Sequence, residues 1–140
     1  MRITKKLFLF AILIFSFSCE EEVILVNCQD CISEEPSDTS LEIKLDASST
    51  GYDTFIKIYE GNLEDSILYS SQQGNTFYSL KVPVAINKKY TVTATYHIHD
   101  NYYTAVDAAT PRVKYDKNQC KDPCYFVYDK DIDLRLKYTK

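Results

Sequence analysis

Four of the five cysteines in this 140-residue chain occur as two closely spaced pairs. Two residues separate Cys28 from Cys31, and three separate Cys120 from Cys124. Such pairs either form disulfides or supply the thiolates of a tetrahedral zinc site. Neither pair carries the glycines of a zinc knuckle, and the βαβ context of a thioredoxin-like redox motif is missing. We therefore expect structural disulfides.

The disulfide pairing stays open at this level, because four cysteines allow three arrangements. Cross-linking between the pairs would join an N-terminal segment to the loop at 121–123. It would close a loop of about 90 residues and contribute on the order of 4 kcal/mol. Local closure, Cys28 with Cys31 and Cys120 with Cys124, contributes less. We expect local closure, because both spacings permit it without bringing distant segments together.

Two histidines form the next group with metal-binding chemistry. His97 and His99 are spaced by two residues, which on a strand places both rings on one face about 6.6 Å apart. A third ligand would come from Asp100, Tyr103 or Asp107. The alternative is a polar strand end beside a hairpin loop, and we favour it because no third ligand is fixed.

Three aspartates, Asp129, Asp131 and Asp133, are also spaced by two residues. They resemble part of a calcium loop, but the glycine of an EF-hand is missing and Ile132 and Leu134 occupy the alternate positions. We expect them to line a solvated strand face, where charges discourage aggregation between sheet edges. The histidines and these aspartates are therefore only weak candidates for metal ligands.

Enzymatic activity and nucleic-acid binding have no support in the sequence. The chain lacks a G-x-S-x-G elbow, an H-E-x-x-H helix and a glycine-rich phosphate loop, and it has only two histidines. Without residues 1–18, which hold three of the 16 basic residues and none of the 20 acidic ones, the net charge is −7. An acidic chain without a basic stripe is not expected to bind nucleic acid.

Short strands must position these side chains. From residue 41 onward apolar and polar residues alternate with period two, as in Leu41, Ile43 and Leu45, and turn residues recur about every ten positions. The predicted strands cover residues 41–47, 53–59, 66–70, 76–82, 90–97, 102–106, 113–115, 125–128 and 132–138. Pro83 is expected to end the fourth strand, and residues 72–75 to form a turn. Eight or nine such strands indicate an all-β, antiparallel β-sandwich.

The 12 tyrosines, with seven phenylalanines and no tryptophan, favour strands. The run from Tyr90 to Tyr96 resembles the penultimate strand of a fibronectin type III or immunoglobulin-like domain, and another Greek-key sandwich would read similarly. Most tyrosines are expected in the core or in cross-strand pairs. Tyr102 and Tyr103, beside a loop, suit contact with a protein or glycan partner.

The N-terminus has the organisation of an export signal. Residues 1–18 contain three basic residues, then an apolar run over 7–15, then small residues before Cys19 and an acidic triplet at 20–22. This resembles the lipobox of bacterial lipoproteins, with Ser16 and Phe17 as departures from its usual residues. Relaxed lipoboxes and acidic residues after the cysteine are similar to those of Bacteroidota lipoproteins.

The resemblance implies cleavage before Cys19, a covalent lipid on that residue, and attachment to a bacterial outer membrane or cell surface. Simple secretion would leave Cys19 as a free thiol, and a spanning anchor would need about 20 apolar residues. We expect a signal peptide at 1–18, an acidic, polar tether at 19–40 and a sandwich domain at 41–140. The lipid would be the only attached group.

Lipidation of Cys19 also leaves an even set of four cysteines to pair. The expected function is that of an interaction or accessory module for a protein or glycan partner. A small-ligand or metal-binding surface protein, for calcium or zinc, is one alternative. A purely structural envelope component is another.

Overall fold

The computed structural model describes residues 24–46, 53–74 and 79–137. The predicted signal, Cys19, the last residue of the predicted strand at 41–47 and the first residues of the predicted strand at 76–82 lie outside this part. The described strands are β1 (Asp38–Lys44), β2 (Thr54–Glu60), β3 (Leu68–Gly74), β4 (Ser79–Ala85), β5 (Tyr90–Ile98), β6 (Asn101–Ala109), β7 (Arg112–Asp116), β8 (Cys124–Tyr128) and β9 (Asp131–Asp133), with one turn of 3-10 helix at Leu63–Asp65.

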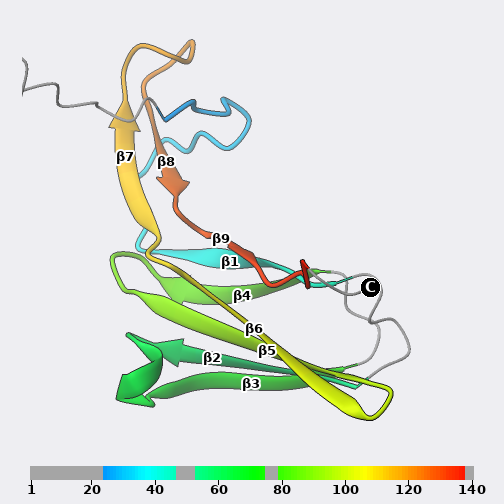
Figure 1. Cartoon of the computed structure of the whole chain (residues 1–140). Coiled ribbons are helices and arrows are strands. Elements are labelled where there is room, and N and C mark those ends of the chain that lie inside the picture. The colour runs from blue at the N-terminus through cyan, green and yellow to red at the C-terminus, as the bar shows by residue number, and fades with distance from the viewer. Residues whose placement is uncertain (1–23, 47–52, 75–78, 138–140) are drawn as a thin grey trace, which may run out of the picture.

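Seven of these strands form a two-layer sandwich (Figure 1). One sheet has the order β4-β1-β9 and the other β3-β2-β5-β6. The chain forms hairpins between β2 and β3 and between β5 and β6, and it changes sheet between β1 and β2, β3 and β4, and β4 and β5. The expected all-β sandwich is confirmed. The order β3-β2-β5-β6 has the same pattern as the C′-C-F-G sheet of variable-type immunoglobulin domains.

The last strand departs from the antiparallel pattern. β9 pairs with β1 in parallel, with Ile132 opposite Ile43. The backbone ladder continues at both ends, where Glu42 N–H donates to the Lys130 carbonyl and Leu134 N–H to the Lys44 carbonyl, both at 2.9 Å. The C-terminal segment therefore completes the three-stranded sheet.

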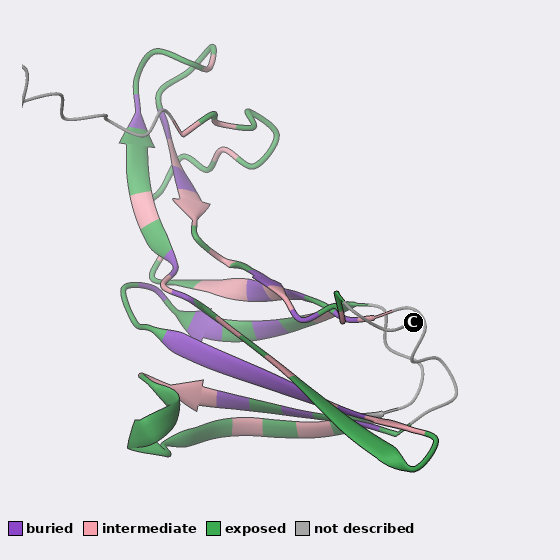
Figure 2. Cartoon of the chain, in the orientation of Figure 1, coloured by how far each residue is buried: buried purple, intermediate pink, exposed green. Residues whose placement is uncertain are grey.

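The core lies between the two sheets and follows the alternation of the sequence (Figure 2). One side chain in two points inward along β1 and β2, as shown by the burial of Leu41 and Ile43 and of Ile56 and Ile58. The complete cluster comprises Leu41, Ile43, Leu45, Ile56, Ile58, Val82, Val84, Tyr90, Val92, Ala94, Tyr96, Ala109, Ile132 and Leu134. Burial of these side chains from water is the main force that holds the sheets together.

Two predicted strand breaks, at Pro83 and at residues 72–75, are wrong. β4 continues through Pro83 to Ala85. β4 is an edge strand that pairs with β1 alone, and a proline is tolerated at an edge because a backbone N–H that faces solvent is not needed for the ladder. Tyr69, on the edge strand of the other sheet, donates a 2.8 Å hydrogen bond to the Pro83 carbonyl. β3 likewise continues through the predicted turn at 72–75 as far as Gly74, because Gln72 and Gln73 pair with β2.

Two buried tyrosines connect the strands through their hydroxyl groups. Tyr96 donates to the Leu134 carbonyl at 2.7 Å and accepts from the Asp46 N–H at 3.2 Å. Tyr90, at the start of β5, accepts from the Ala85 N–H at 3.2 Å, five residues upstream, an arrangement similar to the tyrosine corner of immunoglobulin-type sandwiches. Burial raises the pKa of Tyr96 to about 12, because the core disfavours the phenolate.

Because Tyr96 is buried, the free energy of unfolding should depend on pH in the alkaline range. An unfolded tyrosine loses its proton near pH 10, whereas folded Tyr96 keeps it until about pH 12. The contribution of Tyr96 is therefore complete below pH 10 and is lost between pH 10 and 12, with a fall on the order of 2–3 kcal/mol. Tyr96→Phe should remove this fall and cost about 1–3 kcal/mol at neutral pH, because two backbone groups lose their partner.

Urea unfolding followed by circular dichroism from pH 8 to pH 12 measures both effects. Tyr102→Phe is the control, because Tyr102 is exposed and should leave the profile unchanged. If the stability of Tyr96→Phe fell equally steeply between pH 10 and 12, another group would be responsible for the loss.

Candidate functional site

Strands β7 and β8 form a hairpin that projects from the sandwich (Figure 1). They pair with each other in antiparallel register from Arg112 opposite Tyr128 to Asp116 opposite Cys124, and with neither sheet. The loop at 117–123 therefore lies at the tip of the hairpin, away from the hydrophobic core. We call the hairpin tip and the N-terminal segment bound to it the cysteine pole.

Two disulfides join the N-terminal segment to this tip. Cys28 is bonded to Cys120 and Cys31 to Cys124, with Cα–Cα separations of 5.6 and 5.5 Å. The expected disulfides are present, but the expected local pairing is wrong. The cysteines pair between the two segments because a backbone bridge brings these segments together. The Ile32 N–H donates to the Tyr125 carbonyl at 2.9 Å, and the Tyr125 N–H donates to the Ile32 carbonyl at 2.8 Å.

Side chains of the loop strengthen this attachment. The Asp116 carboxylate accepts from the Asn118 and Gln119 N–H groups, at 3.1 and 2.7 Å, and so folds the loop back on its own strand. The Gln119 amide accepts from the Val26 N–H at 3.1 Å and donates to the Ile24 carbonyl at 3.3 Å. Asp116 and Gln119 were missed in the sequence. Only Asp116 could have been found from the sequence, because Asp116 and Asn118 form a D-x-N pattern that is typical of turns.

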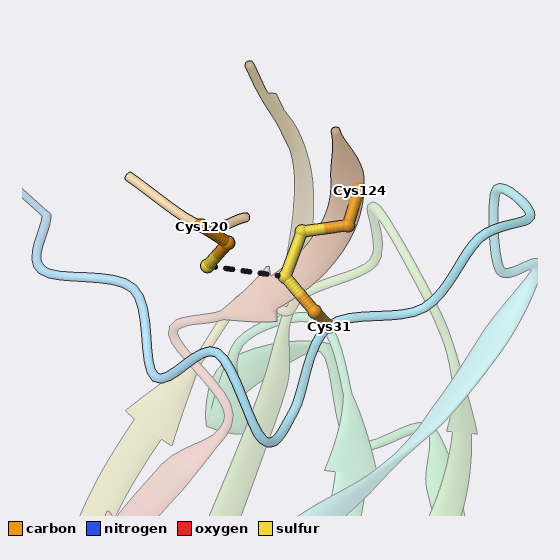
Figure 3. Close-up of side chains that lie close together, drawn as sticks. All are labelled: Cys31, Cys120 and Cys124. Atoms are coloured by element: carbon orange, nitrogen blue, oxygen red, sulfur yellow. Dashed lines mark hydrogen bonds between the residues drawn. A yellow bond between two sulfur atoms is a disulfide. The ribbon is translucent and has the colours of Figure 1, made fainter. Parts of the chain in front are cut away.

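Cys31, Cys120 and Cys124 lie close together (Figure 3), and Cys28 is bonded to Cys120. The Sγ atom of Cys31 lies 3.5 Å from that of Cys120, which belongs to the other disulfide. The Sγ atoms of Cys31, Cys120 and Cys124 all lie within 4.8 Å of one another. The four residues line a hollow of about 290 Å³ together with Ile32, Ser33, Lys121, Asp122 and Pro123.

The structure holds much of the segment predicted as a tether. Contacts with Gln119 begin at Ile24, and two covalent bonds follow at Cys28 and Cys31. β1 begins at Asp38, three residues before the predicted start at Leu41. The part of the tether that precedes Ile24 lies outside the described residues.

His97 and His99 do not share a strand face. His97 pairs with Tyr102 in the β5–β6 hairpin and stacks on its ring, with 4.5 Å between the centroids. His99 lies in the turn with a positive φ of 55°, so the period-two geometry that the metal-site alternative requires ends at Ile98. The favoured interpretation, a polar strand end beside a hairpin loop, is confirmed. Asp107, a candidate third ligand, instead accepts from the Asp133 N–H at 2.9 Å and links β6 to β9.

The three aspartates are engaged separately. Asp129 accepts from the Thr110 N–H at 3.0 Å, and Asp131 lies 3.5 Å from the Lys44 ammonium. Asp133 accepts two hydrogen bonds from the Arg135 guanidinium, at 2.8 and 2.7 Å. This guanidinium holds the pKa of Asp133 well below its usual range.

The described part of the chain thus contains a single group of three or more side chains placed to hold a metal ion, and it consists of Cys31, Cys120 and Cys124. Among the same residues, no helix has the length and apolar character needed to cross a membrane. Comparisons with protein-family models, with curated proteins and with solved structures found no match to this chain.

Proposed function

We propose that this chain is a lipid-anchored protein of a bacterial envelope, an outer membrane or cell surface, and that its sandwich is a non-enzymatic interaction module. The observation that carries the proposal is the pair of disulfides, Cys28–Cys120 and Cys31–Cys124. Disulfides form and persist in oxidising, extracytoplasmic compartments. They use four of the five cysteines and leave Cys19, the residue of the lipobox-like signal, available for a lipid.

The disulfides also set the distance between the anchor and the domain. Nine residue steps separate Cys19 from Cys28, and an extended chain covers at most about 3.3–3.6 Å per residue. The cysteine pole would therefore lie within about 30 Å of the lipid. Two or three acyl chains suffice to hold a small domain on a bilayer.

This geometry leaves the opposite end of the sandwich for a partner. The turn of the β5–β6 hairpin lies at the other end of the molecule from the β7–β8 tip (Figure 1). Its exposed apolar side chains include Tyr102, which is 68% exposed, with Tyr103 and Val106 along the same strand. Tyrosine rings with polar hydroxyl groups suit contact with a protein or a glycan.

Replacing the anchor residue tests the proposal. Cys19→Ser should shift the protein from the membrane fraction to the soluble fraction and abolish labelling with a palmitate analogue, because both depend on acylation at this position. The matched control is the pair Cys28→Ser and Cys120→Ser, which removes two other cysteines and should leave attachment and labelling intact. Continued membrane attachment of Cys19→Ser would contradict the anchor.

The partner surface needs a separate experiment. Cross-linking on intact cells, followed by purification of the full chain, should recover a defined protein or glycan in stoichiometric amount. Recovery should fall in the double variant Tyr102→Ala and Tyr103→Ala and not in Tyr115→Ala, an exposed tyrosine on β7. Absence of any stoichiometric partner would favour a purely structural envelope component.

A further inference from the structure

The spacing of the sulfur atoms at the cysteine pole fits a second chemistry besides disulfide formation. Zinc binds four thiolates tetrahedrally at about 2.3 Å, which places the sulfur atoms about 3.8 Å apart. Cys31 Sγ and Cys120 Sγ, which are not bonded to each other, are 3.5 Å apart, and with Cys124 Sγ they lie within 4.8 Å. Cys28 joins the group through its bond to Cys120. Small rotations of the side chains would give tetrahedral spacing once the disulfides open.

Contacts other than the disulfides hold the two segments together. The reciprocal hydrogen bonds between Ile32 and Tyr125 place the residue after Cys31 opposite the residue after Cys124. The Gln119 side chain binds the backbone of residues 24 and 26, just before Cys28. These contacts do not require an S–S bond. In a reduced chain that is folded, they would therefore keep the four sulfur atoms near one another.

The lining of the site selects the kind of ion. Each segment contributes two cysteines, one as C-x-x-C and the other as C-x-x-x-C, and these spacings occur in four-thiolate zinc sites. Thiolates are soft ligands that suit zinc and disfavour calcium and magnesium. The hollow of about 290 Å³ beside the sulfur atoms gives an ion access from solvent. Lys121 and Asp122 line the same hollow and carry opposite charges.

We propose that the reduced cysteine pole is a tetrathiolate zinc site formed by Cys28, Cys31, Cys120 and Cys124. A phosphine reductant opens each disulfide, takes one oxygen atom from water to become a phosphine oxide, and leaves two thiols. Binding of one Zn²⁺ then converts the thiols to thiolates and releases their protons to solvent. The disulfide form and the zinc form exclude each other, because each sulfur is bonded either to another sulfur or to the metal.

Cobalt titration of the full chain in detergent, reduced with a phosphine under anaerobic conditions, tests this site. We expect one Co²⁺ per chain, with the visible bands of tetrahedral cobalt and a sulfur-to-cobalt charge-transfer band. One equivalent of Zn²⁺ should remove both signals. The oxidised chain should show neither, because its sulfur atoms are held in disulfides.

Variants separate the site from other thiols. Cys31→Ser and Cys124→Ser should each lose the tetrathiolate spectrum, whereas Cys19→Ser, which removes a cysteine outside the cluster, should retain it fully. Absence of a stoichiometric cobalt spectrum overturns the proposal whether or not the reduced chain keeps its sheet structure, because four-thiolate sites also assemble from unfolded chains. Unchanged spectra in both cluster variants, or equal binding by the oxidised chain, also overturn it.

Discussion

Loss of both disulfides should lower the free energy of unfolding by about 7 kcal/mol, whereas loss of either one alone should lower it by only about 2.5 kcal/mol. The two bonds connect the same two segments and span 92 and 93 residues. Whichever bond remains still closes the long loop around the whole sandwich. The second bond then closes only a small ring formed by residues 28–31 and 120–124, which restricts the unfolded chain far less.

Urea unfolding of three variants measures this difference. These are Cys28→Ala with Cys120→Ala, Cys31→Ala with Cys124→Ala, and the variant that carries all four changes, each with a chelator present. Because a domain of this size has about 5–15 kcal/mol of stability, the fourfold variant should be marginal or unfolded at 25 °C. Cys19→Ser is the control and should match the unaltered chain. The two disulfides would instead act independently if each paired variant lost the same free energy of unfolding and the two losses added up to that of the fourfold variant.

The sandwich could be predicted from the sequence because its signals are local. Alternation of apolar residues such as Leu41 and Ile43, or Ile56 and Ile58, selects the inner face of each strand without knowledge of its neighbours. The strand ends at Pro83 and Gln72 were wrong for the opposite reason. Whether a proline or a glutamine pair stops a strand depends on which edge of which sheet it occupies, and that is a property of the assembled fold.

The cysteine pole could be predicted only in part. The even set of four cysteines indicated disulfides, but their partners depend on the bridge between Ile32 and Tyr125, two residues 93 positions apart. Spacing within each pair carries no information about that contact. The favoured interpretation of the histidine pair, a polar strand end beside a hairpin loop, is confirmed, because the turn begins at His99, whose positive φ interrupts the period of the strand. The sequence signals failed wherever a contact between distant segments decides the geometry.

The hairpin and the sandwich therefore have different sources of stability. All buried residues of the main cluster belong to the two sheets or directly follow their strands, and among the described residues none comes from β7 or β8. The cysteine pole is instead held by disulfides, the backbone bridge and the contacts of Gln119. Loss of the disulfides would therefore remove no contact of the main cluster, and it would destabilise the sandwich through the greater conformational freedom of the unfolded chain.

Ile132→Ala should lower the free energy of unfolding by about 3 kcal/mol, although β9 is only three residues long. Ile132 is fully buried in the main cluster and lies opposite Ile43 in the parallel pair. Deleting its side chain leaves a cavity between two sheets that cannot close without breaking the ladder to β1.

Urea unfolding of Ile132→Ala compares this strand with an exposed position. Val106→Ala is the matched control, because it removes an apolar side chain that is 53% exposed on β6, and exposed substitutions usually change stability by less than about 0.5 kcal/mol. Equal, small losses in both variants would mean that β9 separates from β1 before the sandwich unfolds. A large loss in Ile132→Ala alone would make this parallel strand part of the cooperative core, because the cavity energy counts fully only if β9 stays in place until global unfolding.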